Sequence, residues 1–368
     1  MIRSFDYLRA MPEIEAELLD VTARVLRSGQ LILGPETGAF EREFAEYTGA
    51  KHCVGVASGT AALHLALMAL GLGPGDEVIT VANTCVPTIA AIRLTGAIPV
   101  FADVREEDLM LDPDLAERSI TSRTRCILPV HLWGRAADLA RLTSLAAKYE
   151  LYLVEDCAQA IGTTYGSRQV GTVGDMGCFS FYPTKNLGAM GDAGAIITNS
   201  DELADRLRKL RFYGYNDVGE SVIEGTNARI SEIQAAMLRV KLRRLSSWLA
   251  RRRAVAAIYD AGIRSPLVAL PPKQIGVEPS WHQYVVRTGW RDGLMESLRL
   301  ADIESAVHYR VPVHRMPVYL RHLAQTPALP VTERAAGEII SLPIHESISL
   351  EEARSVVLTI NEYTGGNT

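Results

Sequence analysis

Short apolar runs alternate with amphipathic segments along the first two-thirds of the chain. The apolar runs predict strands at residues 52–56, 77–81, 99–102, 124–130, 151–155, 178–181 and 195–198. Between most of them, apolar residues recur at helical spacing, which predicts helices at residues 60–70, 86–95, 113–119, 136–149 and 201–210. Apolar strands that alternate with helices are typical of a mainly parallel sheet covered on both faces.

The pattern continues on either side of this alternation. Helical spacing predicts further helical segments at residues 12–29, 39–47 and 228–261. The proline-containing stretch 265–279 follows, and a strand at 282–287 begins another alternation of strands and helices. We therefore predict an α/β protein whose large domain, residues 1–245, has a mainly parallel central sheet flanked by helices. A small C-terminal α+β domain, residues 246–368, completes it.

Composition and charge exclude several classes of function. The 368 residues carry a net charge of −5, so the chain lacks the positive excess that binds nucleic acid or an anionic membrane surface. No apolar run is long enough to span a bilayer, and the start lacks the basic and then apolar pattern of a signal peptide. We expect a cytoplasmic protein whose partners are small molecules.

The five cysteines form no CxxC spacing, and they support neither disulfides nor a metal site. Four of them, Cys53, Cys126, Cys157 and Cys178, are expected to be small core residues, whereas the role of Cys85 stays open.

Lys185 lies between a short apolar strand and a turn that contains Gly188, Gly191 and Gly194. A lysine in a dry turn crowded by backbone loses hydration of its ammonium, which lowers its pKa and makes the nucleophilic amine available. Such an amine forms a Schiff base with pyridoxal phosphate. For this stretch alone, a surface lysine in a glycine-rich turn is the alternative.

Ser58, Gly59 and Thr60 form a turn between a predicted strand and the helix that follows. The free N–H groups and positive dipole end of a helix bind anions, and the two hydroxyls add donors. The turn therefore predicts a phosphate site. Viewed alone, it is equally typical of ordinary helix capping by Ser58 or Thr60.

The strand at 151–155 is followed directly by Asp156. A carboxylate at the end of a core strand is costly unless it is paired, so Asp156 should face a cation. The protonated pyridine nitrogen of pyridoxal phosphate is such a cation, and an aspartate there sustains the ring as an electron sink. Capping of the next helix, or a pair with an arginine, is the alternative. A later polar turn that contains Asn227 indicates by itself only a helix N-cap.

Taken together, these segments resemble the nucleotide-sugar aminotransferases, which are pyridoxal-phosphate enzymes with the aspartate-aminotransferase fold, fold type I. The resemblance runs from residues 34–35 to 341–343. It is carried by motifs in a fixed order: SGTAAL at 58–63, GDEVI at 75–79, VHLWG at 130–134, EDCAQ at 155–159, SFYPTK at 180–185 and NAR at 227–229. One such motif is weak evidence, whereas the whole series is specific.

The resemblance implies a role for each matching residue. Lys185 would bind the cofactor as a Schiff base and then move the proton between the cofactor and sugar carbons. Asp156 would hold the pyridine nitrogen, Gln159 would hydrogen-bond the ring hydroxyl, and Ala158 would pack against one face of the ring. The implied cofactor is pyridoxal 5'-phosphate, with pyridoxamine 5'-phosphate as its intermediate form.

The resemblance also implies how the phosphate is held and how subunits assemble. Gly59, Thr60 and Ser180 would bind the phosphate, together with Ser58 of the same turn. Asn227 would reach the site from a second subunit, which implies a homodimer with shared active sites. The implied substrates are L-glutamate as amino donor and a nucleotide-linked keto sugar as acceptor.

Two segments of the chain bear on the cofactor ring and on the sugar. Where many relatives place an aromatic side chain to stack on the ring, this chain has Cys85, and a thiol offers less stacking surface. His308 and Tyr309 belong to a segment that resembles a sugar-approaching loop of relatives, so both are candidate substrate contacts. A lone histidine is also often structural.

Three other functions are compatible with parts of the pattern. A cyclitol aminotransferase would take a keto-inositol in place of the nucleotide sugar. The related sugar dehydratases commonly replace the lysine by histidine, and Lys185 argues against that activity. A non-catalytic regulator would require a damaged cofactor site or an attached DNA-binding module, and the sequence has neither.

Overall fold

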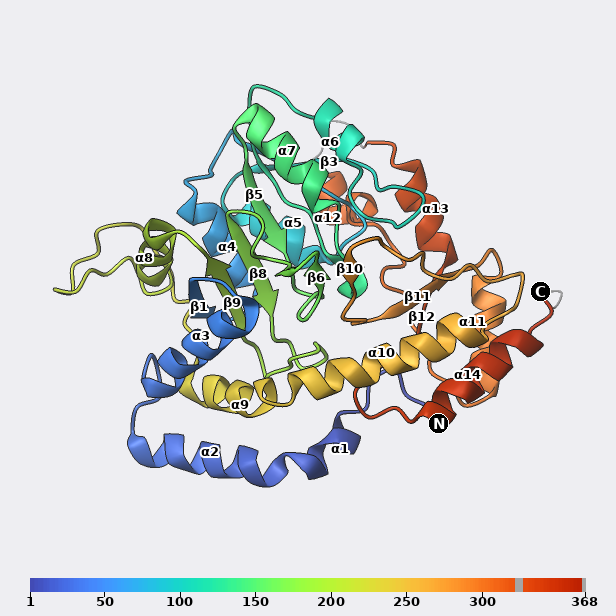
Figure 1. Cartoon of the computed structure of the whole chain (residues 1–368). Coiled ribbons are helices and arrows are strands. Elements are labelled where there is room, and N and C mark those ends of the chain that lie inside the picture. The colour runs from blue at the N-terminus through green and yellow to red at the C-terminus, as the bar shows by residue number, and fades with distance from the viewer. Residues whose placement is uncertain (322–326, 366–368) are drawn as a thin grey trace.

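A seven-stranded sheet forms the centre of the computed structural model, which describes residues 1–321 and 327–365 (Figure 1). Its strands are β1 (His52–Val56), β2 (Glu77–Thr80), β3 (Ile98–Phe101), β4 (Thr124–Ile127), β5 (Tyr152–Asp156), β8 (Met176–Ser180) and β9 (Gly194–Thr198). Their order is β1-β9-β8-β5-β4-β2-β3. Only β9 runs antiparallel to its neighbours, β1 and β8, so the predicted mainly parallel sheet is confirmed. The strand predicted to reach residue 130 ends at Ile127, two residues before Pro129, which has no N–H to donate.

Helices cover this sheet. They are α3 (Pro35–Thr48), α4 (Gly59–Ala69), α5 (Val86–Leu94), α6 (Pro113–Arg118), α7 (Leu139–Tyr149) and α8 (Asp201–Leu210). The helix predicted at 39–47 begins earlier, with Pro35 at its first position, where a missing N–H costs nothing. The helix predicted at 136–149 begins later, because Asp138 caps it by accepting a hydrogen bond from the Arg141 N–H.

Two predicted helical regions are divided. The N-terminal region 12–29 contains the end of the 3-10 turn η1 (Met11–Glu13) and then α2 (Glu15–Ser28), and the short helix α1 (Tyr7–Ala10) precedes it. The region 228–261 is not one helix but two, α9 (Glu232–Leu242) and α10 (Leu245–Gly262). At the junction the Arg244 N–H bonds to the Lys241 carbonyl, which tightens the turn. Residues before α9 are not helical, because Ala228 and Arg229 pair with the segment at the end of β1.

The C-terminal part has its own core around the antiparallel pair β11 (Tyr284–Arg287) and β12 (Ile339–Leu342). Helices α10, α11 (Arg291–Leu300) and α14 (Leu350–Glu362) contribute to this core, whereas α12 (Pro317–Leu320) and α13 (Pro330–Glu338) place Tyr319 and Ala335 in the core of the large sheet. Short strands β6 (Thr164–Tyr165), β7 (Arg168–Gln169) and β10 (Val277–Glu278) form a third sheet. The N-terminus lies against this part, since Ile2 pairs with Ile303. The domain division at residue 245 stays a prediction.

The core beside β8 is aromatic. Phe44 meets Phe179 and Phe181 edge-on, with ring centroids 5.2 and 5.3 Å apart, and Phe40 stacks on Phe44 at 5.7 Å. These side chains fix the end of β8, from which the loop carrying Lys185 departs.

Among residues 1–321 and 327–365, none of the helices has the length and apolarity needed to cross a bilayer.

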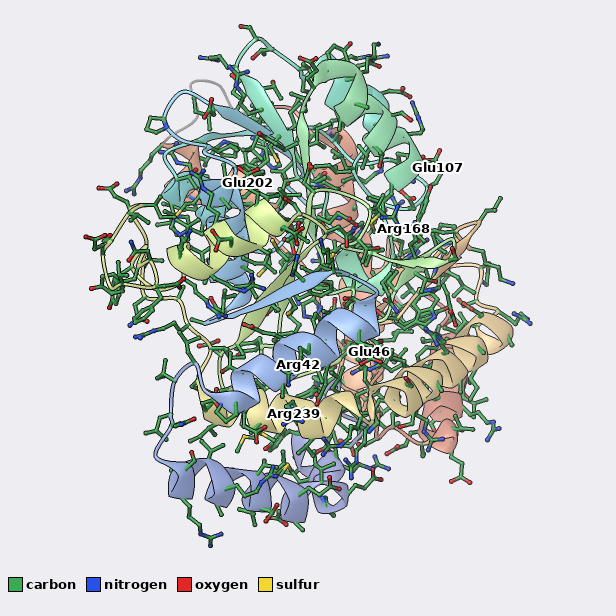
Figure 2. The ribbon with its side chains drawn as sticks, turned by 60° about the vertical axis from the view of Figure 1, so that its left-hand side comes forward. Arg42, Glu46, Glu107, Arg168, Glu202 and Arg239 are labelled. Atoms are coloured by element: carbon green, nitrogen blue, oxygen red, sulfur yellow. The ribbon has the colours of Figure 1, made fainter. Side chains whose placement is uncertain are left out.

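Helix α9 ties the N-terminal helices to the loop that follows β8. On one side, Arg239, labelled in Figure 2, extends from α9. It forms ion pairs with Glu36 and Glu43 of α3 at 2.5 and 2.6 Å. On the other side, Gln234 accepts from the Met190 N–H at 2.8 Å, and Lys241 Nζ donates to the Gly188 carbonyl at 2.6 Å. The backbone a few residues after Lys185 is therefore held from outside the sheet.

Candidate active site

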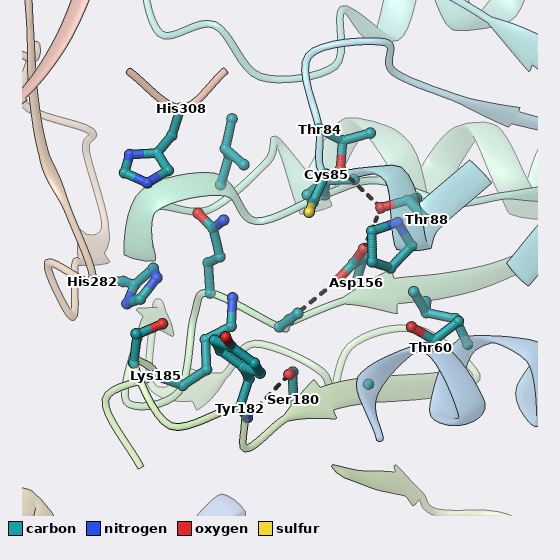
Figure 3. Close-up of a pocket in the computed structure, with 18 of the residues that line it drawn as sticks. Thr60, Thr84, Cys85, Thr88, Asp156, Ser180, Tyr182, Lys185, His282 and His308 are labelled. Atoms are coloured by element: carbon teal, nitrogen blue, oxygen red, sulfur yellow. Dashed lines mark hydrogen bonds between the residues drawn. The ribbon is translucent and has the colours of Figure 1, made fainter. Parts of the chain in front are cut away.

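A cavity of about 370 Å³ opens at the carboxyl ends of β5 and β8 (Figure 3). The sheet brings to it almost every residue that the sequence predicted for the site: Ser58, Gly59, Thr60, Cys85, Asp156, Ala158, Gln159, Ser180, Lys185, His308 and Tyr309. Parallel sheets gather ligands at this edge because the loops that follow neighbouring strands converge there. His308 and Tyr309 come from the C-terminal part and close the cavity on its far side.

The turn before α4 has the features of an anion site. Ser58 is the N-cap of α4, and its Oγ accepts from the Ala61 N–H at 3.1 Å, so the capping alternative holds for this residue. Among the described residues, the N–H groups of Gly59 and Thr60 have no hydrogen-bond partner. A Cβ on Gly59 would lie 2.6 Å from the Ser180 Cβ, so only glycine lets α4 begin beside β8. Two free N–H groups and the hydroxyls of Thr60 and Ser180 therefore face one corner of the cavity.

Asp156, at the end of β5, is only 3% exposed. Its Oδ1 accepts from the Ala158 N–H at 3.1 Å, and its Oδ2 accepts from the Thr88 hydroxyl at 2.9 Å, which in turn contacts Thr84 (Figure 3). Within the described part of the chain no arginine pairs with Asp156, so that alternative is wrong. Burial raises the pKa of Asp156, and Lys185 offsets this only in part. The carboxylate thus lacks a full cationic partner, and a protonated ring nitrogen fits there.

Lys185 occupies the turn after β8, where its N–H donates to the Tyr182 carbonyl at 2.8 Å. Burial lowers the pKa of Lys185, whereas the nearby Asp156 charge opposes that change. A lowered pKa increases the fraction of neutral, nucleophilic amine. The lysine is half-buried in the cavity wall and does not lie on the outer surface.

Gln159 links the large sheet to the C-terminal part. Its Oε1 accepts from the Trp133 N–H at 2.9 Å, and its Nε2 donates to the Tyr309 hydroxyl at 2.9 Å. The Trp133 indole N–H binds the His308 carbonyl at 3.1 Å. Burial raises the pKa of Tyr309, whose hydroxyl contacts Cys85, and burial lowers the pKa of His308 to about 4. Both His308 and Tyr309 are neutral at physiological pH.

The sequence analysis missed several residues around this site. Thr88, which holds Asp156, lies on α5 and had no sequence signal beyond its position in a predicted helix. His282 and Gln283 also line the cavity, from the segment before β11. The four cysteines expected in the core are buried, and Cys85 lies in the cavity wall.

A second cluster beside Asp156 consists of His131, Glu155 and Cys157, all buried. His131 Nδ1 accepts from the Ala137 N–H, so its Nε2 carries the proton that it donates to Glu155 at 2.9 Å. The Glu155 carboxylate also accepts three backbone N–H groups, from Gly171, Val173 and Gly174. The protein itself therefore occupies the acceptor positions of the Glu155 carboxylate, and these hydrogen bonds stabilise the segment before β8.

Asn227 does not line the cavity of its own chain. It is exposed, and its Oδ1 accepts from Arg229 Nε at 3.0 Å. The proposed contact of Asn227 with the cofactor therefore requires a second copy of the chain.

A desolvated lysine, a buried carboxylate without a full cationic partner and an anion-binding turn meet at one sheet edge. On this fold they define a pyridoxal-phosphate-dependent enzyme of fold type I. The chain belongs to the DegT/DnrJ/EryC1/StrS aminotransferase family, whose profile matches residues 12–361. Solved structures of similar proteins carry pyridoxal phosphate or pyridoxamine phosphate, and pyridoxal phosphate is the cofactor of this enzyme.

Similarity to individual proteins extends over nearly the whole chain. It is 45% identical to dTDP-3-amino-3,4,6-trideoxy-alpha-D-glucose transaminase of Micromonospora megalomicea subsp. nigra, over 98% of each chain. It is 42% identical to dTDP-3-amino-3,6-dideoxy-alpha-D-galactopyranose transaminase of Aneurinibacillus thermoaerophilus, over 99% of each. The crystal structure of DesV from S. venezuelae, in complex with a ketimine intermediate, superposes with a TM-score of 0.95 at 44% identity, covering 98% of both chains.

Proposed function

We propose that the protein transfers an amino group from L-glutamate to the keto carbon at C3 of a dTDP-linked deoxysugar. The observation that carries this proposal is the complete lysine, carboxylate and anion-binding set in one cavity. Two relatives that are at least 42% identical over nearly their full length are named for dTDP-3-amino sugars, which favours dTDP and C3. Because these relatives are aminotransferases of nucleotide sugars, they favour neither a sugar dehydratase nor a cyclitol aminotransferase as the function of this chain.

When bound, pyridoxal phosphate supplies an electrophilic carbonyl and an electron sink for the transfer. The free N–H groups of Gly59 and Thr60, with the Thr60 and Ser180 hydroxyls, would hold its phosphate. Asp156 would stay ionised against the ring nitrogen, because a cation at that point lowers the pKa that burial raises. Ala158 would pack on the ring.

Lys185 would hold the cofactor and, once released, move a proton at the substrate carbon. Its lowered pKa favours the neutral amine, which can accept that proton. Gln159 is fixed by Trp133 and Tyr309, and the second N–H of its Nε2 would donate to the ring hydroxyl. His308 and Tyr309 would contact the sugar from the C-terminal side. Cys85 leaves more room above the ring than an aromatic side chain.

The acceptor is tested by a panel of dTDP-linked 3-keto sugars, dTDP-linked 4-keto sugars and keto-inositol, with L-glutamate as donor. Purified protein should show the absorption band of the lysine-bound cofactor, and L-glutamate should convert it to the pyridoxamine form. Of the panel, a 3-keto sugar should then restore the first band most rapidly. A 4-keto sugar or keto-inositol that reacts faster would contradict the proposed acceptor. An active Lys185→Ala protein would contradict the assignment of the lysine.

We also propose that the enzyme is a cytoplasmic homodimer in which Asn227 contacts the cofactor phosphate of the partner. The segment that leads to Asn227 carries four exposed apolar side chains, Tyr213, Tyr215, Val218 and Val222, and projects beyond α8 in Figure 1. Exposed apolar residues gathered on one segment are typical of an interface.

Subunit mixing tests the shared site. Lys185→Ala and Asn227→Leu proteins are each expected to have little activity. Co-refolded together, they should form mixed dimers in which one site carries both substitutions and the other carries none, so activity returns. Two inactive partners that stay inactive after subunit exchange has been verified would show that each site is built from one chain.

A further inference from the structure

A second cavity, of about 310 Å³, is lined by Arg135, by Arg253 and Asp260 of α10, and by residues of the segment 271–281. It shares no lining residue with the active-site cavity, although both reach the contact between residues 132–135 and 280–283. Its volume suits a small molecule, because ligand cavities begin at about 300 Å³. The charges that face this cavity indicate which kind of molecule would fit.

Arg135 brings a buried positive charge to the cavity without a carboxylate partner. The residue is only 4% exposed, and its Nη2 donates to the Pro272 carbonyl at 2.6 Å. Among residues 1–321 and 327–365, Nε and Nη1 donate to nothing, yet neither nitrogen is cut off from solvent. Burial lowers the pKa of Arg135 to about 10, so the guanidinium stays charged at neutral pH; the acid that opposes this change most, Asp108, is already paired with Arg105. A buried charge without a partner is costly, so these nitrogens are suited to bind an anion.

Asp260 brings the complementary charge to the same cavity. It is half-buried, and its Oδ1 accepts from the Tyr284 hydroxyl at 2.5 Å. Its Oδ2 accepts from none of the residues that the structure describes, and it too is open to solvent. Within the same residues Asp260 pairs with no cation, because Arg253 is already paired with Glu278 at 3.0 Å. The cavity therefore holds a guanidinium and a carboxylate that are both unpaired.

The rest of the lining narrows the class of ligand. A simple anion would satisfy Arg135 and leave Asp260 unpaired, whereas an α-amino acid carries a carboxylate for one and an ammonium group for the other. Lys273 adds a further positive charge, but it is exposed. Much of the remaining wall is apolar and suits an apolar side chain: Pro271, Pro272, Val277, Pro279 and Trp281.

We propose that this cavity is a binding site for an α-amino acid, whose carboxylate accepts from the unpaired N–H groups of Arg135 and whose ammonium group donates to Asp260 Oδ2. The apolar wall would hold the side chain of the ligand. This site is separate from the cavity in which the amino donor would react. The inference does not depend on the proposed sugar acceptor.

The test is a calorimetric titration of the cofactor-loaded protein with L-leucine, L-phenylalanine and L-tryptophan. At least one of them should bind wild type saturably. Arg135→Met should weaken that binding at least about tenfold, because the carboxylate loses its charged donors. Arg251→Met, an exposed arginine of α10 outside the cavity, is the matched control and should bind as wild type does. Binding that is unchanged in Arg135→Met, or no binding of any of the three at millimolar concentration, would overturn the proposal.

A second variant tests the ammonium contact and does not depend on Arg135→Met folding normally. Wild type should prefer the amino acid at least about tenfold over its deaminated acid, which is 4-methylpentanoate, 3-phenylpropionate or indole-3-propionate. Asp260→Asn keeps an oxygen for the Tyr284 hydroxyl but loses the charge, so this preference should disappear. A distorted cavity would weaken both ligands and leave their ratio unchanged, which would refute the contact. Inorganic phosphate that binds wild type more tightly than every amino acid would show a site for simple anions and would also overturn the proposal.

Discussion

Replacement of Asp156 by asparagine should have opposite effects on cofactor binding and on the stability of the cofactor-free protein. Asparagine has the same shape, so its oxygen can still accept from the Ala158 N–H and its amide can meet the Thr88 hydroxyl. What changes is the charge. With the cofactor bound, the carboxylate would face a cation, and loss of one partner of a buried ion pair costs about 3–5 kcal/mol. Cofactor affinity or turnover should therefore fall by roughly two to three and a half orders of magnitude.

The cofactor-free protein should respond in the other direction. Burial raises the pKa of Asp156 in the folded state above its value in the unfolded chain. The folded state then binds more protons, so ionisation of Asp156 lowers the free energy of unfolding as pH rises, by about 1.4 kcal/mol for each unit of raised pKa. Asp156→Asn removes this penalty. At pH 7 the variant should be more stable than wild type, and the difference should disappear in acid, where Asp156 is protonated in both states.

Two measurements check this reasoning. Urea unfolding of cofactor-free wild-type and variant proteins at pH 7 and in acid gives the stability difference, and fluorescence titration with pyridoxal phosphate gives the affinity. Thr88→Val is the matched control, because it removes one hydrogen bond to Asp156 and keeps the charge, so its loss of affinity should be far smaller. If Asp156→Asn binds the cofactor as tightly as wild type, Asp156 is not the partner of the ring nitrogen. If Asp156→Asn is less stable than wild type at pH 7, the inference that the buried carboxylate lacks a full cationic partner is wrong.

Three further changes probe the supports of the site. Gly59→Ala places a Cβ 2.6 Å from the Ser180 Cβ, so pyridoxal phosphate should bind at least about tenfold more weakly in a fluorescence titration, and unchanged binding would contradict the close packing of α4 on β8. Phe44→Ala removes the centre of the aromatic cluster and should cost about 3–5 kcal/mol in urea unfolding, whereas a loss below about 1 kcal/mol would mean that the cluster collapses to fill the space. Burial lowers the pKa of Lys241 to about 8, so the unfolded chain binds more protons above that pH, and stability should rise between about pH 8 and 10. Lys241→Met should lack that rise, and a wild-type curve without it would contradict the burial of this amine.

Much of the fold and the principal site residues follow from local sequence. Apolar strands and amphipathic helices have short-range periodicities, so the seven strands of the main sheet and most of the helices lie within a few residues of their predicted positions. Lys185, Asp156 and the Ser58 to Thr60 turn were predicted because each sits in a short motif at a strand end. The chemistry of these motifs depends on their immediate surroundings.

Contacts between distant segments were decided only by the tertiary structure. The apolar pattern runs through residues 228–261 without a break, yet pairing of Ala228 and Arg229 near β1 delays α9, and a turn at Arg244 separates it from α10. Likewise, Thr88 reaches Asp156, and His282 reaches the Lys185 cavity, because strand order and domain packing place them there. Periodicity reports which face of an element is buried, but not which remote side chain it meets, and these remote partners set the proton positions and charges of the site.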